Sequence, residues 1–342
     1  MKKNLRKKAL VPALAMVLAA VIALSGVTYA WFTVGNTANI NNLNVNVKTA
    51  DGIQISLDGK SWKSTITTKE ILAAVDNDTY SGRCILYPTG EIAPVSSAGV
   101  VTNGKMEMFY GEYNEDGTLK SVKLTEKNGD EETHFIAFDL FFKYSGNQPL
   151  YLNVGKGMSV VSTISIDEEG KATLLTDEAD MGTRTAVRVG FVPMGSFESD
   201  VDARNQTEAV LDDPNEVAEV INKINIWEPN SETRATGSEG GIGKLPYEGF
   251  IKDFDNNGKD YVLTEGQTAA VTTFDETATL MDLSKTYSKI RVYIWLEGQD
   301  VDCINNISNG DFQVTLQFAV PDENGNTTKP TETTTPSESE NG

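Results

Sequence analysis

Apolar and polar side chains alternate with a period of two through much of this 342-residue chain. Because successive side chains of a strand point to opposite faces, the alternation predicts strands that bury one face. It is cleanest near the C-terminus, at Phe312, Val314, Leu316, Phe318 and Val320. Five earlier segments have the same rhythm, with apolar residues at Leu43, Val45 and Val47; Ile53, Ile55 and Leu57; Ile136, Phe138, Leu140 and Phe142; Val187, Val189 and Phe191; and Val292, Ile294 and Leu296.

Turn-forming residue pairs separate these segments and favour antiparallel connections. They include Asp58-Gly59, Asn128-Gly129, Asn257-Gly258 and Asn309-Gly310. We therefore expect an all-β fold, an antiparallel β-sandwich with one or two short helices in its connections. One helix is expected at residues 68–75. The other is expected at 214–224, with Asp213 as N-cap and Pro214 in the first turn.

The N-terminus is typical of an export signal. Basic residues within the first eight positions precede an apolar run at 9–24, and small residues follow at Thr28 and Ala30. We expect cleavage after Ala30, which makes Trp31 the first residue of a secreted or cell-surface protein. The run of about 16 residues is shorter than the roughly 20 that span a bilayer, so membrane contact is expected only during export. A retained anchor is the alternative, since Trp31 and Phe32 suit a membrane interface.

Three parts of the chain are expected: a signal at 1–30, one β-sandwich domain at 31–320 and a tail at 321–342. The domain carries an inserted helix and a polar loop at about 200–250. The tail is rich in Thr, Ser, Glu and Pro and has too few apolar side chains to order itself. Removing the signal, which holds five basic and no acidic residues, changes the net charge from −20 to −25. That charge disfavours binding to nucleic acid and to anionic membranes.

Two cysteines, Cys84 and Cys303, are the only ones in the chain. In an oxidising compartment they can form one disulfide between the N- and C-terminal parts of the fold. Two buried free thiols are the alternative, because sequence does not show whether their Cα atoms come within reach. With a single histidine, His134, a zinc site of Cys and His ligands is excluded.

A weak calcium candidate lies at residues 253–260. Asp253, Asp255, Asn257 and Asp260 place oxygen atoms around a tight turn, as calcium loops do. The pattern is partial, since the twelfth position of an EF-hand loop falls on Thr264 rather than on an acid. An ordinary surface turn is the alternative. No other cofactor is expected.

Catalytic patterns are scarce in this sequence. His134 has no nucleophile elbow or other local support for a Ser-His-Asp triad, and one histidine cannot form a His-Glu-x-x-His metal motif. We read His134 as a solvent-facing strand residue. Trp62, Trp227, Tyr247 and Trp295 can stack on a sugar or serve as core residues. We therefore expect a protein that is not an enzyme.

The segment Gly26-Val27-Thr28-Tyr29-Ala30-Trp31-Phe32-Thr33, followed by an Asn-rich alternating strand up to Val47, resembles the TasA/camelysin family of secreted proteins from Gram-positive bacteria. The resemblance covers about 50 residues. It implies a jelly-roll-like sandwich, removal of the signal by a SipW-type signal peptidase, and assembly into biofilm matrix fibres. In that assembly the N-terminal strand of one subunit completes the sheet of the next, which on this chain corresponds to residues 31–47.

The residues themselves also make this strand a donor candidate. Leu43, Val45 and Val47 cannot remain in water and must pair with a sheet edge of their own domain or of a neighbour. We expect an exported structural protein of the cell surface or extracellular matrix that associates with itself or with other matrix proteins. The alternative is a surface adhesin or carbohydrate-binding sandwich with a structural calcium site.

Overall fold

The computed structural model describes part of the chain, and every structural statement below concerns that part. It covers residues 38–39, 44–49, 52–75, 83–88, 91–97, 99–113, 119–124, 134–154, 159–166, 172–174, 186–210, 224–229, 251–254, 261–263, 270–272, 278–298 and 311–321. The expected signal at 1–30, the helix positions 214–223, most of the polar loop and the tail from residue 322 lie outside it.

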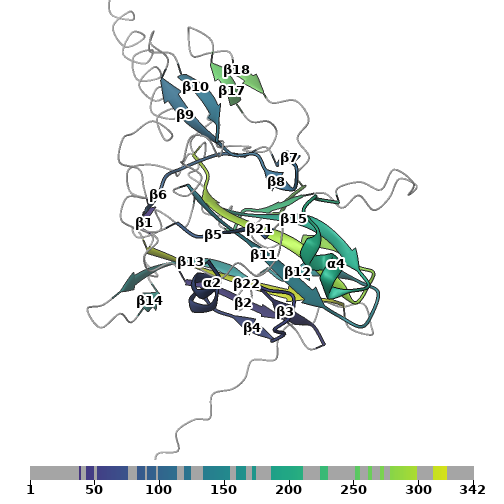
Figure 1. The fold of residues 1–342 in the computed structure, drawn as a ribbon. Helices are drawn as coiled ribbons and strands as arrows, with labels where there is room; N and C mark the ends of the chain where they lie inside the picture. Colours follow the sequence, from purple (N-terminus) through teal and green to yellow (C-terminus); the bar gives the residue numbers. More distant parts are fainter. Residues whose placement is uncertain are drawn as a thin grey trace, which may run out of the picture.

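Two seven-stranded sheets form the body of the fold and confirm the all-β sandwich (Figure 1). Sheet I has the order β19-β16-β15-β21-β11-β3, and β5 also pairs with β11. Its strands are β3 (Gln54–Ser56), β5 (Ile85–Leu86), β11 (Phe135–Lys143), β15 (Val187–Phe197), β16 (Asn225–Trp227), β19 (Ala270–Thr272) and β21 (Tyr287–Leu296).

Sheet II is built around the C-terminal strand β22 (Asp311–Ala319). Strand β22 pairs with β12 and β13 along one edge and with β2 along the other edge. The other strands are β2 (Asn44–Thr49), β4 (Thr65–Ile66), β12 (Gln148–Leu152), β13 (Val160–Ile166), β14 (Ala172–Leu174) and β20 (Ala278–Leu283). Almost every pair in the two sheets is antiparallel; β2–β22 and β16–β19 are parallel.

Smaller strand pairs lie beside the sandwich. A four-stranded sheet contains β9 (Phe109–Tyr113), β10 (Leu119–Lys123), β17 (Ile251–Phe254) and β18 (Tyr261–Leu263). Two two-stranded sheets pair β7 (Val101–Thr102) with β8 (Lys105–Met106), and β1 (Ala38–Asn39) with β6 (Glu91–Ile92). Figure 1 shows β9, β10, β17 and β18 beyond sheet I, on the side away from sheet II.

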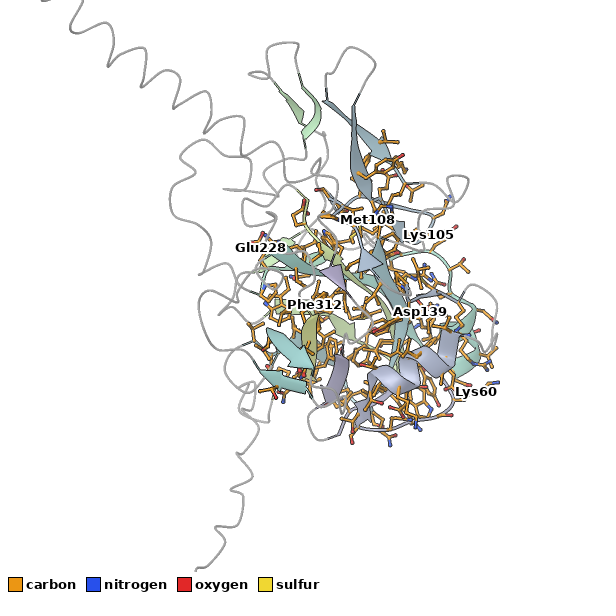
Figure 2. The ribbon with its side chains drawn as sticks, turned by 90° about the vertical axis from the view of Figure 1, so that its left-hand side faces the viewer. Lys60, Lys105, Met108, Asp139, Glu228 and Phe312 are labelled. Atoms are coloured by element: carbon orange, nitrogen blue, oxygen red, sulfur yellow. The ribbon has the colours of Figure 1, made fainter. Side chains whose placement is uncertain are left out.

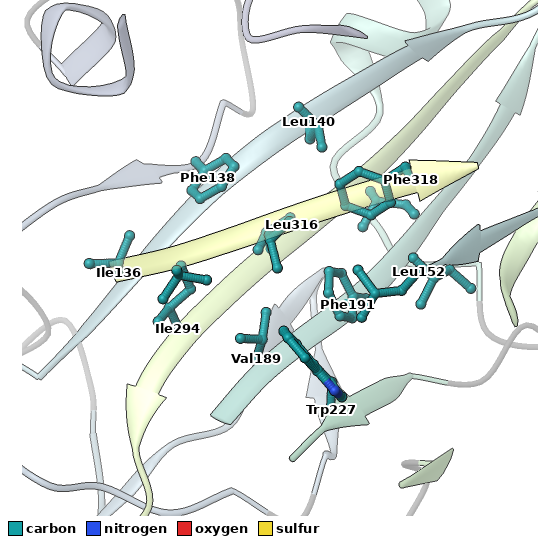
Figure 3. Close-up of a cluster of buried hydrophobic side chains, with 14 of the residues drawn as sticks. Ile136, Phe138, Leu140, Leu152, Val189, Phe191, Trp227, Ile294, Leu316 and Phe318 are labelled. Carbon is teal, nitrogen blue, oxygen red and sulfur yellow. The ribbon is translucent and has the colours of Figure 1, made fainter. Parts of the chain in front are cut away.

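The main core lies between the two sheets (Figure 3). The alternating residues of β22 all enter it: Phe312, Val314, Leu316 and Phe318 are fully buried. The Phe318 ring meets Phe142 of sheet I edge to face, with ring centroids 5.1 Å apart. Contacts of this kind between facing sheets fix how the layers pack. The period-two pattern of this strand therefore predicted its buried face correctly.

The central strands of sheet I are buried on both faces, which corrects the expectation of half-buried strands. Every residue of β15 from Val187 to Gly195 is buried, and so are nearly all of β11 and β21. The reason is a second apolar cluster on the outer face of the sheet, where Ala137, Tyr293 and Trp295 pack against Met106 and Met108. The segment that covers this face comes from residues 84–124.

The helix expected at residues 68–75 is present as α2 (Thr68–Val75). A second short helix, α4 (Asp200–Asn205), was not predicted. Its N-cap is Ser199, whose Oγ accepts a hydrogen bond from the backbone N–H of Asp202 at 3.1 Å. No helix in the described part of the chain has the length and apolar character needed to cross a membrane.

Candidate functional site

The candidate site is the parallel pair formed by β2 and β22, which brings the N-terminal strand beside the C-terminal one. Six residues of β2 register with six of β22, from Asn44 opposite Gln313 to Thr49 opposite Phe318. On its other side β2 registers with only two residues of β4, Ile66 and Thr65. The main attachment of β2 to the sandwich is therefore the edge of β22.

The register connects the predicted donor residues with the main core. Val45 is opposite Val314 and Val47 is opposite Leu316, and the side chains of both β22 residues are fully buried in that core. Opposed residues of paired strands share one face of a sheet. The positions of Val45 and Val47 therefore belong to the core-facing side of sheet II. Leu43, the third predicted donor residue, lies outside the described residues.

The chain passes from one sheet to the other directly after β2. Strand β2 ends at Thr49 in sheet II, and β3 begins at Gln54 in sheet I, where it pairs with β11. Gly52, just before β3, has a φ of +87°, a conformation that favours glycine. Strands β2 and β3, adjacent in sequence, therefore belong to different sheets.

Most of the other predicted site residues fall outside the described part of the chain. These are Ala30 and Trp31 of the cleavage site and Asp255, Asn257 and Asp260 of the calcium candidate. Asp253 lies in β17, where it registers with Lys120 of β10. Among the described residues, no group of three or more His, Cys, Asp or Glu side chains could hold a metal ion. The calcium site stays a prediction.

Cys84 precedes β5, and its thiol is free in this structure. Burial raises the pKa of this thiol to about 11, so it is protonated at neutral pH. Cys303 lies outside the described residues. The disulfide between Cys84 and Cys303 therefore stays a prediction.

The structure also places the single histidine and three of the four tryptophans. His134 comes just before β11 and its ring is stacked on Tyr110, with centroids 6.0 Å apart. Trp227 and Trp295 are fully buried, so neither presents a surface to a sugar. Trp62 packs against Tyr287 at a centroid distance of 5.7 Å. Tyr247 lies outside the described residues.

A buried charged cluster in sheet I was not predicted. Asp139 on β11 accepts a bond from Arg291 Nε at 2.7 Å and pairs with Lys289 Nζ at 2.9 Å, both on β21. All three residues are almost completely buried. The sequence signal was available: Asp139 stands alone among apolar residues of β11, and Lys289 and Arg291 are spaced by two, which places them on one face of a strand.

A second buried ion pair joins Arg188 of β15 and Glu228, which follows β16. The Nε and Oε1 atoms are 3.4 Å apart. Figure 2 shows Glu228 well separated from Asp139. A shifted strand register would leave these buried charges without their counter-ions and is therefore disfavoured.

Comparisons of the chain with protein-family models, with curated proteins and with solved structures found no match.

Proposed function

We propose that this chain is an exported, non-enzymatic structural protein of the cell surface or extracellular matrix, and that its copies assemble by exchanging strand β2. The export-type N-terminus and the resemblance of residues 26–47 to TasA/camelysin proteins support the proposal. A SipW-type signal peptidase is the expected processing enzyme. The observation that carries the proposal is the parallel pairing of β2 with β22.

Strand exchange needs an acceptor edge that any copy can fill. Without β2, residues 313–318 of β22 have unpaired backbone groups on one side, which is a template for an incoming strand. A second copy offers β2 in the same register, because exchange of an identical element reproduces every contact. Since each chain's own strand is tethered nearby, exchange becomes favourable as the protein concentration rises.

The positions of the two strands are compatible with an open chain of subunits. The donor strand lies at the N-terminal end of the described fold, while the acceptor strand is the last strand, β22. Each copy can therefore donate to one neighbour and accept from another. A head-to-tail contact of this type forms filaments when the rotation between subunits does not close a ring.

Negative-stain microscopy of the secreted protein tests the proposal. We expect filaments whose abundance increases with concentration, and an intact mass that places the N-terminus at Trp31. A chain that also lacks residues 31–47 should form none, because it has no strand to donate. A matched control that lacks residues 322–342 instead should still form filaments. A secreted protein that stays monomeric at high concentration would refute assembly, and filaments from the chain without residues 31–47 would refute the role of β2.

A further inference from the structure

A cavity of about 310 Å³ lies on the outer side of sheet I, away from the β2–β22 pair. Three cationic residues line it: Arg83, Lys105 and Arg291. Among the described residues that line the cavity, none is acidic. This composition is unexpected in a chain with 49 acidic and 29 basic residues. Because Arg291 is already paired with Asp139, Arg83 and Lys105 are the lining residues that give the cavity a local charge opposite to that of the molecule.

The neutral part of the lining is mostly apolar. Leu86, Met106, Phe135 and Ala137 belong to it. Cys84 also lines the cavity, and its protonated thiol adds no negative charge at neutral pH. A cavity of this size with apolar walls and a few charged groups is typical of a site for a small organic ligand.

The walls of the cavity are held in place by buried contacts. Arg291 Nη1 donates to the carbonyl oxygen of Gly104 at 2.8 Å, which ties the β7–β8 hairpin to sheet I. Lys289 Nζ donates to the carbonyl of Gln206 at 2.8 Å and so fixes the neighbouring segment. A Cβ on Gly104 would lie 1.9 Å from the Thr207 oxygen, so hairpin and segment are in close contact. The cavity is thus preformed, which lowers the cost of binding.

We propose that this cavity binds a small organic anion with an apolar body, such as a medium-chain monocarboxylate. The carboxylate lies toward Lys105 and Arg83, and the hydrocarbon part packs on Leu86, Met106 and Phe135. Hydrogen bonds between a carboxylate and cationic donors are stronger than those between neutral groups. Because the rest of this acidic molecule repels anions, binding depends on the cationic lining. The inference is independent of assembly through β2.

Titration calorimetry with octanoate as the probe tests the site. We expect octanoate to bind at one site per chain, and octanamide and inorganic phosphate to bind at least about tenfold more weakly, since each lacks one of the two recognised features. Binding of octanamide as tight as that of octanoate would refute the anionic site. Binding of phosphate as tight as that of octanoate would refute the apolar part. No binding of octanoate at millimolar concentration would refute the proposal as a whole.

Two variants with the same charge change locate the site. Lys105→Gln should weaken octanoate binding about tenfold, because one charged hydrogen bond is lost. Lys60→Gln should leave it unchanged, since Lys60 is exposed and does not line the cavity. Figure 2 shows the two lysines on well-separated parts of the molecule. Equal effects of both substitutions would indicate only a general effect of charge and would overturn the assignment.

A second measurement does not depend on the substitution of a cationic residue. In a Cys303→Ser chain, Cys84 is the only thiol, and its alkylation by N-ethylmaleimide reports access to the cavity. Saturating octanoate should slow this reaction several-fold, whereas octanamide at the same concentration should not. If octanoate binds but leaves the rate at Cys84 unchanged, the ligand occupies another place and the assignment to this cavity is wrong.

Discussion

Asp139 is the residue on which the polar interior of sheet I depends. It contacts two buried cations, Arg291 and Lys289, and also accepts the backbone N–H of Cys84 at 3.0 Å. One carboxylate thus links β11, β21 and the segment that leads into β5. Such a pair contributes little net free energy relative to apolar residues, but removal of one partner leaves the other charges uncompensated.

Asp139→Asn is accordingly expected to be strongly destabilising. The free energy of unfolding should fall by about 3–5 kcal/mol, because the side chains of Lys289 and Arg291 stay buried without this carboxylate. Urea denaturation monitored by tryptophan fluorescence measures the change. Asp200→Asn is the matched control: its partner Arg204 forms a partly exposed pair at 3.2 Å, and the loss should be below about 1 kcal/mol. Similar losses for both variants would contradict this account of the cluster.

Asp58 gives the stability a defined dependence on pH. It accepts hydrogen bonds from the backbone N–H groups of Lys60 and Ser61 at 2.8 and 2.7 Å and from the Ser56 hydroxyl at 2.7 Å. Burial alone would raise the pKa of Asp58, but these hydrogen bonds outweigh it and lower the pKa from 3.8 to about 2. The folded state therefore favours the carboxylate, and this contribution is complete above the unfolded pKa.

Asp58→Asn should reveal this contribution. At neutral pH the variant should be less stable by roughly 1 kcal/mol, because charged acceptors hydrogen-bond more strongly than amides. The difference should narrow as the pH falls below 3.8 toward 2, where the wild-type carboxylate becomes protonated. Thermal denaturation of both proteins between pH 5 and pH 2 measures it. A difference that widens on acidification would have the wrong sign and refute the assignment.

At the scale of elements, the β7–β8 hairpin shows a local signal that sequence analysis overlooked. Asn103 and Gly104 connect the two strands with φ angles of +51° and +71°. An Asn-Gly pair with positive φ at both positions is typical of a two-residue hairpin turn. The pair is visible in the sequence, although the strands on either side are only two residues long and have no alternation to mark them.

The close approach at Gly104 predicts an asymmetric result for two glycine substitutions. Gly52→Ala should cost about 1 kcal/mol, because its φ of +87° is strained for alanine while the nearest atom to a Cβ is 4.0 Å away. Gly104→Ala should cost about 2 kcal/mol more, because its Cβ would meet the backbone oxygen of Thr207. Chemical denaturation measures both. Equal costs would mean that the hairpin is not held against residue 207.

Alternation predicted the strands well, and it did so for a physical reason. The alternation of β22 lies within nine consecutive residues, so its buried face could be assigned without knowing which residues elsewhere in the chain contact it. The outer apolar layer on sheet I was missed because its members, such as Met106, Ala137 and Trp295, are far apart in sequence. Helix α4 is too short for a 3.6-residue period, although the Ser199 cap was a readable signal.

The candidate site was predictable only in part. Alternation identified Val45 and Val47 as residues that need a partner strand. It did not identify β22 as that partner or the parallel direction of the pair, since a period of two gives the face of a strand and not its neighbour. The cavity beside Lys105 had no sequence signature at all, because its lining comes from residues 83 to 293.

At the scale of the whole molecule, the two ends of the fold meet in one sheet. The first strand of sheet II, β2, is followed by the first strand of sheet I, β3, and the last strand in the described part of the chain, β22, completes sheet II. Closure of the sandwich through β2 and β22 therefore links residues about 270 positions apart. The entropy of closing so long a loop opposes this pairing, and the buried positions opposite β2 offset that cost.

A single charge in β2 separates assembly from folding. Val45→Asp places a carboxylate opposite the buried Val314, at a cost of several kcal/mol, whereas Asn46→Asp places one opposite the half-buried Thr315 and should cost little. Under strand exchange, Val45→Asp alone should form no filaments. When it is mixed with wild type, the variant should shorten the filaments. Its β22 edge still accepts a β2 strand from a neighbour, but its own β2 strand cannot pair with the next subunit. Asn46→Asp should behave as wild type in both assays.

The melting temperature and microscopy together decide between the two roles of β2. If the strand serves only its own sheet, Val45→Asp should lower the melting temperature of the monomer, and wild type should show no filaments to shorten. If it also serves a neighbour, the loss of filaments should accompany the thermal shift, and excess wild-type protein should overcome the shortening by mass action. A Val45→Asp protein that melts normally and still forms filaments would contradict both roles, because neither sheet would then need the residue opposite Val314 to be apolar.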